Sequence, residues 1–298
     1  MFFVLVSSLA FGSGPVDPTA SSICAGVDCG PSFATTTSLD LKLRSVEGQD
    51  VLNKILGDTA FWSGAWQQAY EGKEYDEIRL KDTASGFVPM ITGEGNQDFP
   101  HEVVSDIVYY RNTDLPKYMS GAKAVIPLGS GYDPVVGAEY RDSFYILDLT
   151  VFYGYFPQRM YRKHDDAKNQ SVMWFEKMNA SFVDAGTWTT YQQKMTAAID
   201  GMDKRWPPFN AVVEVGDVYG MFVVEPGKAR TSRVSFVSKL TFADDAGWIA
   251  QWGSQLPPVL RSGLKSGFVA SVAIAKAEAD RRAKKAAAAQ PAPAAPVP

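Results

Sequence analysis

Short apolar segments, broken at close intervals by Gly, Pro, Asp and Asn, fill most of the chain between residues 125 and 242. Many of them alternate apolar and polar residues, which is typical of strands with one wet face and one buried face. The short breaks favour hairpins, so an antiparallel meander is expected. The strand candidates are 139–156, 158–165, 170–178, 186–199, 209–225 and 230–242, with two shorter ones earlier at 75–82 and 87–95.

Helical patterns flank these strands. Apolar residues recur at helical spacing after Gly48, and a second helix is expected after residue 96, ending or kinking at Pro116. A long helix is expected over 243–285, with an apolar stripe of residues four apart, namely Leu256, Leu260, Leu264, Phe268 and Val272. The order predicts an α+β fold: a curved antiparallel sheet wrapped around a long C-terminal helix, with an additional N-terminal helix. One helix rarely fills so wide a sheet, so an internal cavity is expected.

The two ends of the chain differ from its middle in composition. Residues 1–12 include an apolar run of the length of a secretory signal peptide, although no Lys or Arg precedes it, so the true start lies upstream or the segment is something else. Residues 13–47 are expected to be a linker, 48–283 one ligand-binding domain, and 284–298 a disordered Ala/Pro tail. The expected protein is soluble and is secreted or periplasmic.

Cys24 and Cys29 are the only two cysteines and lie five residues apart. In an oxidising compartment they are expected to form a local disulfide. A lipid anchor on Cys24 is an alternative, while a zinc site would need more ligands than these two. No metal is therefore expected.

Charge and motifs exclude several function classes. The formal net charge is −4 with both signs scattered, so nucleic acid is not an expected partner. The chain has two histidines, of which His101 is expected to be a surface or capping residue and His164 to lie in a solvated turn. No sequence motif of a hydrolase, a metalloprotease or a phosphate-binding loop is present, so no cofactor is expected.

The segment VFYGYFPQRMYRKHDD, residues 151–166, places aromatic side chains around a Gly and a Pro. It is interpreted as a strand, a corner at Gly154 and Pro157, and a second strand at the rim of a cavity. An ordinary packed hairpin is the alternative. Asp148 lies in an apolar strand and needs a partner if buried. Arg159 is the candidate for an ion pair, and the alternatives are a tether for a ligand hydroxyl, a catalytic acid, or an exposed side chain.

In their order and spacing, these segments resemble START-type lipid-transfer domains and the related polyketide cyclases, a superfamily with a helix-grip fold. The resemblance rests on 99–129, which look like its first helical segment and Val-rich strand, on 144–165, and on 248–268, which look like its closing helix. Arg159 matches an Arg that commonly follows the corner, although the acidic residue often beside it is replaced by Gln158 and Met160.

The resemblance implies an apolar ligand, such as a sterol or phospholipid, held between the sheet and the C-terminal helix. The side chains expected to contact it are Phe144, Ile146, Asp148, Tyr153, Tyr155, Phe156, Arg159, Trp174, Tyr191, Met221, Trp252, Leu260, Leu264 and Phe268. A monomer with transient membrane contact is expected. The alternatives are an enzyme of the cyclase/aromatase type on the same fold and a protein-interaction module of an envelope complex.

Overall fold

A computed structural model describes the chain in several segments. They are 36–57, 68–70, 77–81, 90–94, 101–119, 121–148, 153–202, 212–226 and 232–242, together with helical positions 270, 273, 274, 277, 278, 280–285 and 288. Cys24, Cys29, Trp252, Leu260, Leu264 and Phe268 lie outside these residues.

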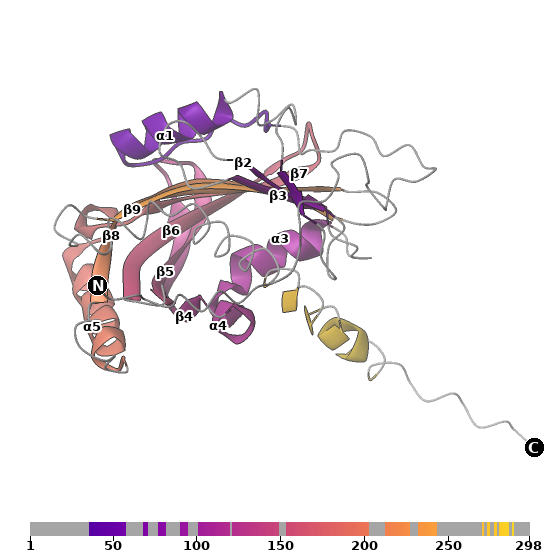
Figure 1. Cartoon of the computed structure of the whole chain (residues 1–298). Helices are drawn as coiled ribbons and strands as arrows, with labels where there is room; N and C mark the ends of the chain where they lie inside the picture. The colour runs from indigo at the N-terminus through magenta and orange to yellow at the C-terminus, as the bar shows by residue number, and fades with distance from the viewer. Residues whose placement is uncertain are drawn as a thin grey trace, which may run out of the picture.

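A nine-stranded sheet of order β1-β2-β3-β9-β8-β7-β6-β5-β4 forms the centre of the described part of the molecule. Neighbouring strands are antiparallel throughout. The strands are β1 Gln68–Tyr70, β2 Glu77–Lys81, β3 Met90–Glu94, β4 Ala122–Asp133, β5 Ala138–Asp148, β6 Tyr153–Asp165, β7 Gln170–Lys177, β8 Val212–Pro226 and β9 Ser232–Phe242. The predicted α+β fold with a curved antiparallel sheet is confirmed (Figure 1).

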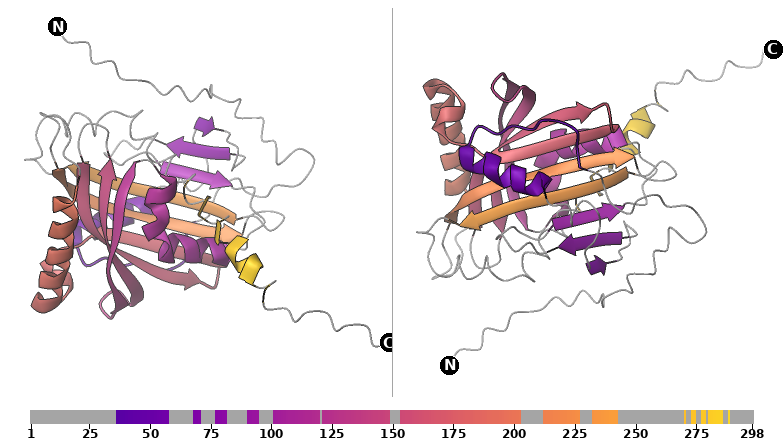
Figure 2. Two further views of the ribbon diagram at one scale, coloured as in Figure 1. Left: turned by 90° about the horizontal axis from the view of Figure 1, so that it is seen from below. Right: turned by 90° about the horizontal axis from the view of Figure 1, so that it is seen from above.

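Helices cover both faces of the sheet. They are α1 Val46–Leu56, α3 His101–Tyr110, η2 Asn112–Asp114, α4 Leu115–Tyr118, η3 Ala180–Phe182 and α5 Ala185–Asp200. Figure 1 shows α1 above the sheet and α3 below it, and the two views of Figure 2 show the same helices lying across opposite faces. We call the side of α1 and α5 the outer face and the side of α3 the inner face. The helical residue Ile274 packs with α3, so the C-terminal helical positions belong to the inner side.

Strand alternation gives the two faces different cores. On the outer face, α1 packs against Tyr161 of β6, Trp174 of β7 and Met221 of β8. On the inner face, α3 packs against Met160 of β6 and Phe175 of β7, each one residue away in sequence from an outer-face side chain. Because successive side chains of a strand point to opposite faces, β6 and β7 bury apolar side chains on both sides.

The strand candidate 186–199 is wrong, since these residues lie within α5. Asp184 begins this helix by accepting hydrogen bonds from the backbone N–H of Thr187 at 3.0 Å and from its hydroxyl at 2.6 Å. The hydroxyls of Thr189 and Thr190 donate to the carbonyls one turn earlier, so these β-branched residues are accommodated in a helix. Of the helix residues only Tyr191 is fully buried.

The predicted corner at Gly154 and Pro157 is also wrong, because β6 runs without interruption from Tyr153 to Asp165. The carbonyl of Pro157 accepts a hydrogen bond from the backbone N–H of Met178, just beyond the end of β7. Any other residue at position 157 would direct its backbone N–H to this same side. The pairing of β6 with β7 ends at Gln158, so the proline removes no hydrogen bond between the two strands. Past that end, β6 pairs directly with β8 in parallel.

Residues 36–45, which we call the N-terminal strap, lie along the outer face. Leu41 and Leu43 are buried there, and the carbonyl of Lys42 accepts a hydrogen bond from Trp174 Nε1 at 2.7 Å. The structure therefore begins before residue 48, the predicted start of the domain. At the other end, positions 284, 285 and 288 are helical although the tail was predicted to begin at 284.

Asp165 holds the start of the N-terminal strap. Its carboxylate accepts hydrogen bonds from the Thr37 hydroxyl at 2.7 Å and from the Ser38 N–H and hydroxyl, both at 2.6 Å. Burial alone would raise the pKa of Asp165, but these donors lower it to about 2. The charged form of Asp165 therefore stabilises the folded chain.

Asp165→Asn is expected to lower the free energy of unfolding by about 2 kcal/mol at neutral pH, because it weakens hydrogen bonds to a charged group. The folded pKa is below the unfolded value of about 3.9, so the stabilisation is present above that value and is lost as the pH falls toward 2. Urea denaturation at pH values from 7 down to 2.5 measures this difference. Asp166→Asn, at a side chain that is 98% exposed, is the matched control and should change little. A loss that is the same at every pH would contradict the assignment.

Candidate functional site

The inner face carries a large apolar cluster. Met160 and Met173 are fully buried in it, and three phenylalanines from adjacent strands stack beside them. The ring centroids of Phe222 and Phe236 are 4.4 Å apart, and Phe175 lies 5.9 Å from the first and 6.2 Å from the second. Phe222 and Phe236 are only partly buried, so apolar ring surface remains open on this side of the sheet.

One compact group of neutral polar side chains interrupts this apolar surface. The Asn112 amide of η2 donates to the Ser143 hydroxyl at 3.2 Å and to the Tyr145 hydroxyl at 2.9 Å. All three residues are more than nine-tenths buried. The Tyr145 ring stacks on Phe156, and burial raises the pKa of Tyr145 to about 12, so its hydroxyl stays protonated.

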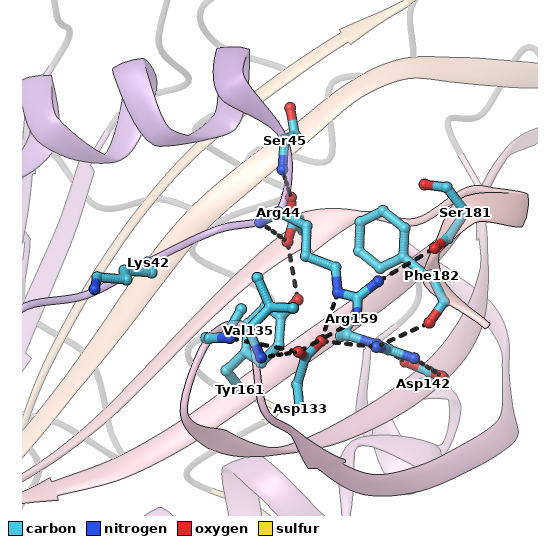
Figure 3. Close-up of polar contacts among 12 residues, drawn as sticks. Lys42, Arg44, Ser45, Asp133, Val135, Asp142, Arg159, Tyr161, Ser181 and Phe182 are labelled. Atoms are coloured by element: carbon cyan, nitrogen blue, oxygen red, sulfur yellow. Dashed lines mark hydrogen bonds and ion pairs between the residues drawn. The ribbon is translucent and has the colours of Figure 1, made fainter.

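The outer face contains a buried network of charges around Arg159 (Figure 3). The guanidinium is bidentate to Asp142, with distances of 2.7 Å from Nε and 2.8 Å from Nη2, and Nη1 donates to Asp133 at 3.1 Å. Its plane lies over the Tyr140 ring, 3.6 Å from the centroid. Arg159 is 1% exposed, so this pairing of β4, β5 and β6 takes place away from water.

The N-terminal strap joins the same network. Arg44 donates to Asp133 at 2.7 Å, and the backbone N–H groups of Arg44 and Ser45 donate to the Glu176 carboxylate at 2.9 and 3.0 Å. Glu176 also accepts from the Tyr161 hydroxyl at 3.0 Å. One connected set of bonds therefore ties the strap to strands β4, β6 and β7.

The three carboxyl groups of the network titrate differently. Burial raises the pKa of Asp142, and the guanidinium of Arg159 offsets this only in part. Burial likewise raises the pKa of Glu176 against the hydrogen bonds that it accepts from the strap. For Asp133 burial acts in the same direction, but hydrogen bonds from Arg44 and from two backbone N–H groups outweigh it and lower the pKa. Asp142 and Glu176 are therefore the groups that gain a proton first on acidification.

This network is built to hold the fold together. Each of its carboxylates accepts at least two hydrogen bonds, and the network residues Asp133, Asp142, Arg159, Tyr161 and Glu176 are 1% exposed or less. The Tyr191 hydroxyl of α5 caps it by donating to Asp142 at 3.2 Å, directly over Gly129, where a Cβ would collide with that hydroxyl. Among the residues that the structure describes, each carboxylate of the network is thus bonded within it.

Arg159 does not pair with Asp148, and that predicted ion pair is wrong. In the β5–β6 register Asp142 is opposite Arg159, while Asp148 is opposite Tyr153 at the other end of the hairpin. Asp148 follows Phe144 and Ile146 on alternate positions of β5, which places it on the outer face.

Most of the predicted ligand contacts that the structure describes lie on the outer face instead of facing the C-terminal helix. Phe144, Ile146, Tyr153 and Tyr155 pack with Tyr191 of α5. Trp174 and Met221 pack under α1, and Arg159 belongs to the charged network. Only Phe156 faces α3 and Ile274.

The two histidines differ in exposure. His101 is 5% exposed on α3, so the expectation of a surface residue is wrong, and burial lowers its pKa. The His164 side chain is 43% exposed, and its ring centroid lies 6.5 Å from that of His101. Among the described residues, no three His, Cys, Asp or Glu side chains are placed to hold a metal ion. No helix in the same part of the chain is long and apolar enough to cross a bilayer.

No family model matches the chain, and no curated protein matches it. Similar solved structures include human StAR-related lipid transfer protein 5, which is 12% identical with a TM-score of 0.45 and is covered over 95% of its length by 77% of this chain. The lipid transfer and protein localization domain of human StarD13 is 12% identical with a TM-score of 0.41, covering 78% of this chain and 96% of that domain. The Zhui aromatase/cyclase from Streptomyces is 14% identical with a TM-score of 0.39, covering 69% of this chain and 96% of that protein.

The likeness is one of fold alone. The residues that the sequence did not point to are Asn112, Asp133, Asp142 and Glu176. Asp142 and Glu176 are carboxylates close to buried apolar residues of β5 and β7, so a correct strand register would have pointed to them. Asp133 is the last residue of β4 and follows three exposed positions, so the sequence carried no such signal for it.

Arg159→Met is expected to lower the free energy of unfolding by about 4 kcal/mol, because it leaves Asp142 buried without its counter-charge. Adding Asp142→Asn to that variant should recover part of the loss. Chemical denaturation of the two single variants and the double variant measures both effects. Lys163→Met, at an exposed position of the same strand, is the control. If Arg159→Met lowered the free energy of unfolding by less than about 1 kcal/mol, the network would not be a main source of stability.

Proposed function

We propose that the chain binds an apolar ligand, a lipid or a similar molecule, against the inner face of the sheet. The observation that carries this proposal is the partly buried pair Phe222 and Phe236, which continues the apolar surface of Met160, Met173 and Phe175. Removing such surface from water is favourable by roughly 25 cal/mol per Å². The resemblance of the sequence to lipid-transfer domains supports the same reading.

The geometry favours binding over catalysis by Asp148. That residue is the acid in the enzyme alternative, and it lies on the outer face of β5, on the opposite side of the sheet from Phe222 and Phe236. The buried carboxylates Asp133, Asp142 and Glu176 are also on the outer face, where they are bonded to Arg44, Arg159 and the strap.

Organic extraction of the purified chain, followed by mass spectrometry, is expected to release an apolar compound in a stoichiometric amount. Phe222→Glu should reduce that amount at least tenfold, because it places a charge against the ligand. Tyr132→Glu is the control, at a side chain that is 65% exposed. Circular dichroism establishes that both variants fold. Repeated empty extracts, together with no uptake from liposomes, would overturn the proposal.

We also propose that the protein is exported. The apolar run from Phe2 to Phe11 supports this, and it lies outside the described residues. Expression of the full chain with its own N-terminus, followed by mass measurement of the mature form, is expected to show removal of a segment ending near Gly12. A mature form that retains Phe2 to Phe11 and stays in the cytoplasm would contradict export.

A further inference from the structure

The inner face holds a buried hydrogen-bonding atom that no described residue satisfies. Asn112 is 6% exposed, and its amide nitrogen donates to both Ser143 and Tyr145. Among the residues that the structure describes, no donor reaches its amide oxygen. If the amide were turned over, the oxygen would accept from the two hydroxyls and the nitrogen would be left over instead. One polar atom of Asn112 is thus unpartnered in either orientation.

A second buried amide side chain lies on the same face of the sheet. Gln158 of β6 is directly opposite Ser143 of β5, and strand alternation places both on the inner face with Phe156 and Met160. Ser143 is 3% exposed and Gln158 is 6% exposed. Asn112, Ser143, Tyr145 and Gln158 therefore form a polar patch in the apolar inner face, which we call the amide patch.

All four side chains of the amide patch are neutral at ordinary pH. Burial holds the Tyr145 hydroxyl in its protonated form. The nearest cationic side chain along β5, Arg141, faces the rings of Tyr109 and Tyr110, with its guanidinium carbon 5.9 and 5.1 Å from their centroids. The charge of Arg141 acts on Tyr145. Lys177, which lies opposite Gln158, is already paired with Glu214 and donates to the Val215 carbonyl, both at 2.7 Å. A charged group brought to the amide patch would therefore lose its hydration beside cations that already have partners.

We propose that the amide patch binds the polar end of the ligand, and that the ligand is an uncharged molecule with a hydroxyl group. A hydroxyl both donates and accepts, so it satisfies the free atom of Asn112 in either amide orientation. Leaving a buried polar atom unsatisfied is unfavourable, so the ligand hydroxyl is favoured at this position. Asn112 is then the residue that selects the ligand, while Ser143 and Tyr145 position its amide.

This inference rests on the proposed function and is tested on the full chain by displacement of the neutral fluorescent probe N-phenyl-1-naphthylamine. The competitors are dodecane, dodecanol and dodecanoate, which share one chain and differ at its end. Dodecanol is expected to displace the probe at roughly tenfold lower concentration than the other two. In Asn112→Leu that advantage should disappear while the value for dodecane stays unchanged.

Tyr145→Phe removes a single hydroxyl and keeps the ring that stacks on Phe156, so it tests the amide patch even if Asn112→Leu does not fold. It should reduce the advantage of dodecanol severalfold. Tyr132→Phe makes the same change at an exposed side chain and should have no effect.

Three results would overturn the inference. Equal displacement by dodecane and dodecanol, or preference for dodecanoate, would refute the amide patch and leave apolar binding intact. An advantage of dodecanol that persists in both Asn112→Leu and Tyr145→Phe would refute the assigned residues. Failure of the wild-type chain to bind the probe and all three competitors would overturn the proposed function together with the inference.

Discussion

The bidentate pair between Arg159 and Asp142 fixes how the strands of this sheet meet. This pair can form at only one register of β5 and β6. If one strand slipped by one residue, its side chains would exchange faces, and Asp142 and Arg159 would lie on opposite sides of the sheet. Asp133, the last residue of β4, binds the same guanidinium from the turn of the β4–β5 hairpin, and Arg44 of the strap donates to Asp133. Two charges buried this deeply are costly unless each finds its partners, so alternative registers are strongly disfavoured.

That register separates two kinds of surface on one sheet. The outer face is closed by α1, α5 and the strap, and its polar groups bond to one another. The inner face is apolar, with partly buried rings and one amide atom without a partner in the described chain. A side with a buried network of hydrogen bonds thus supports a side whose rings stay partly open, and this is the arrangement expected if the proposed ligand binds there.

The sequence was sufficient for the class of fold and insufficient for the site, for a specific physical reason. Alternation reveals that a strand has two faces, but it does not say which of them is the inner one. Placing a corner at Gly154 and Pro157 hid the true hairpin, in which β5 ends at Asp148 and β6 begins at Tyr153. With that boundary, Asp148 lies opposite Tyr153. Six residues back along β5 and six residues forward along β6, Asp142 then lies opposite Arg159. The residues of α5 looked like a strand because Thr, Trp and Tyr favour strands, whereas the cap at Asp184 and the turn-to-turn bonds of Thr189 and Thr190 decide for a helix.

The strap has a consequence for the order in which the chain becomes structured. It precedes every strand in the sequence, yet its hydrogen bonds reach residues about 130 positions later, with separations of 128 from Thr37 to Asp165 and 132 from Arg44 to Glu176. During synthesis these residues leave the ribosome early and have no surface to dock on until β6 and β7 have been made. Closing so long a loop is slow, so the strap, although it is the first segment that the structure describes, is expected to be among the last to dock.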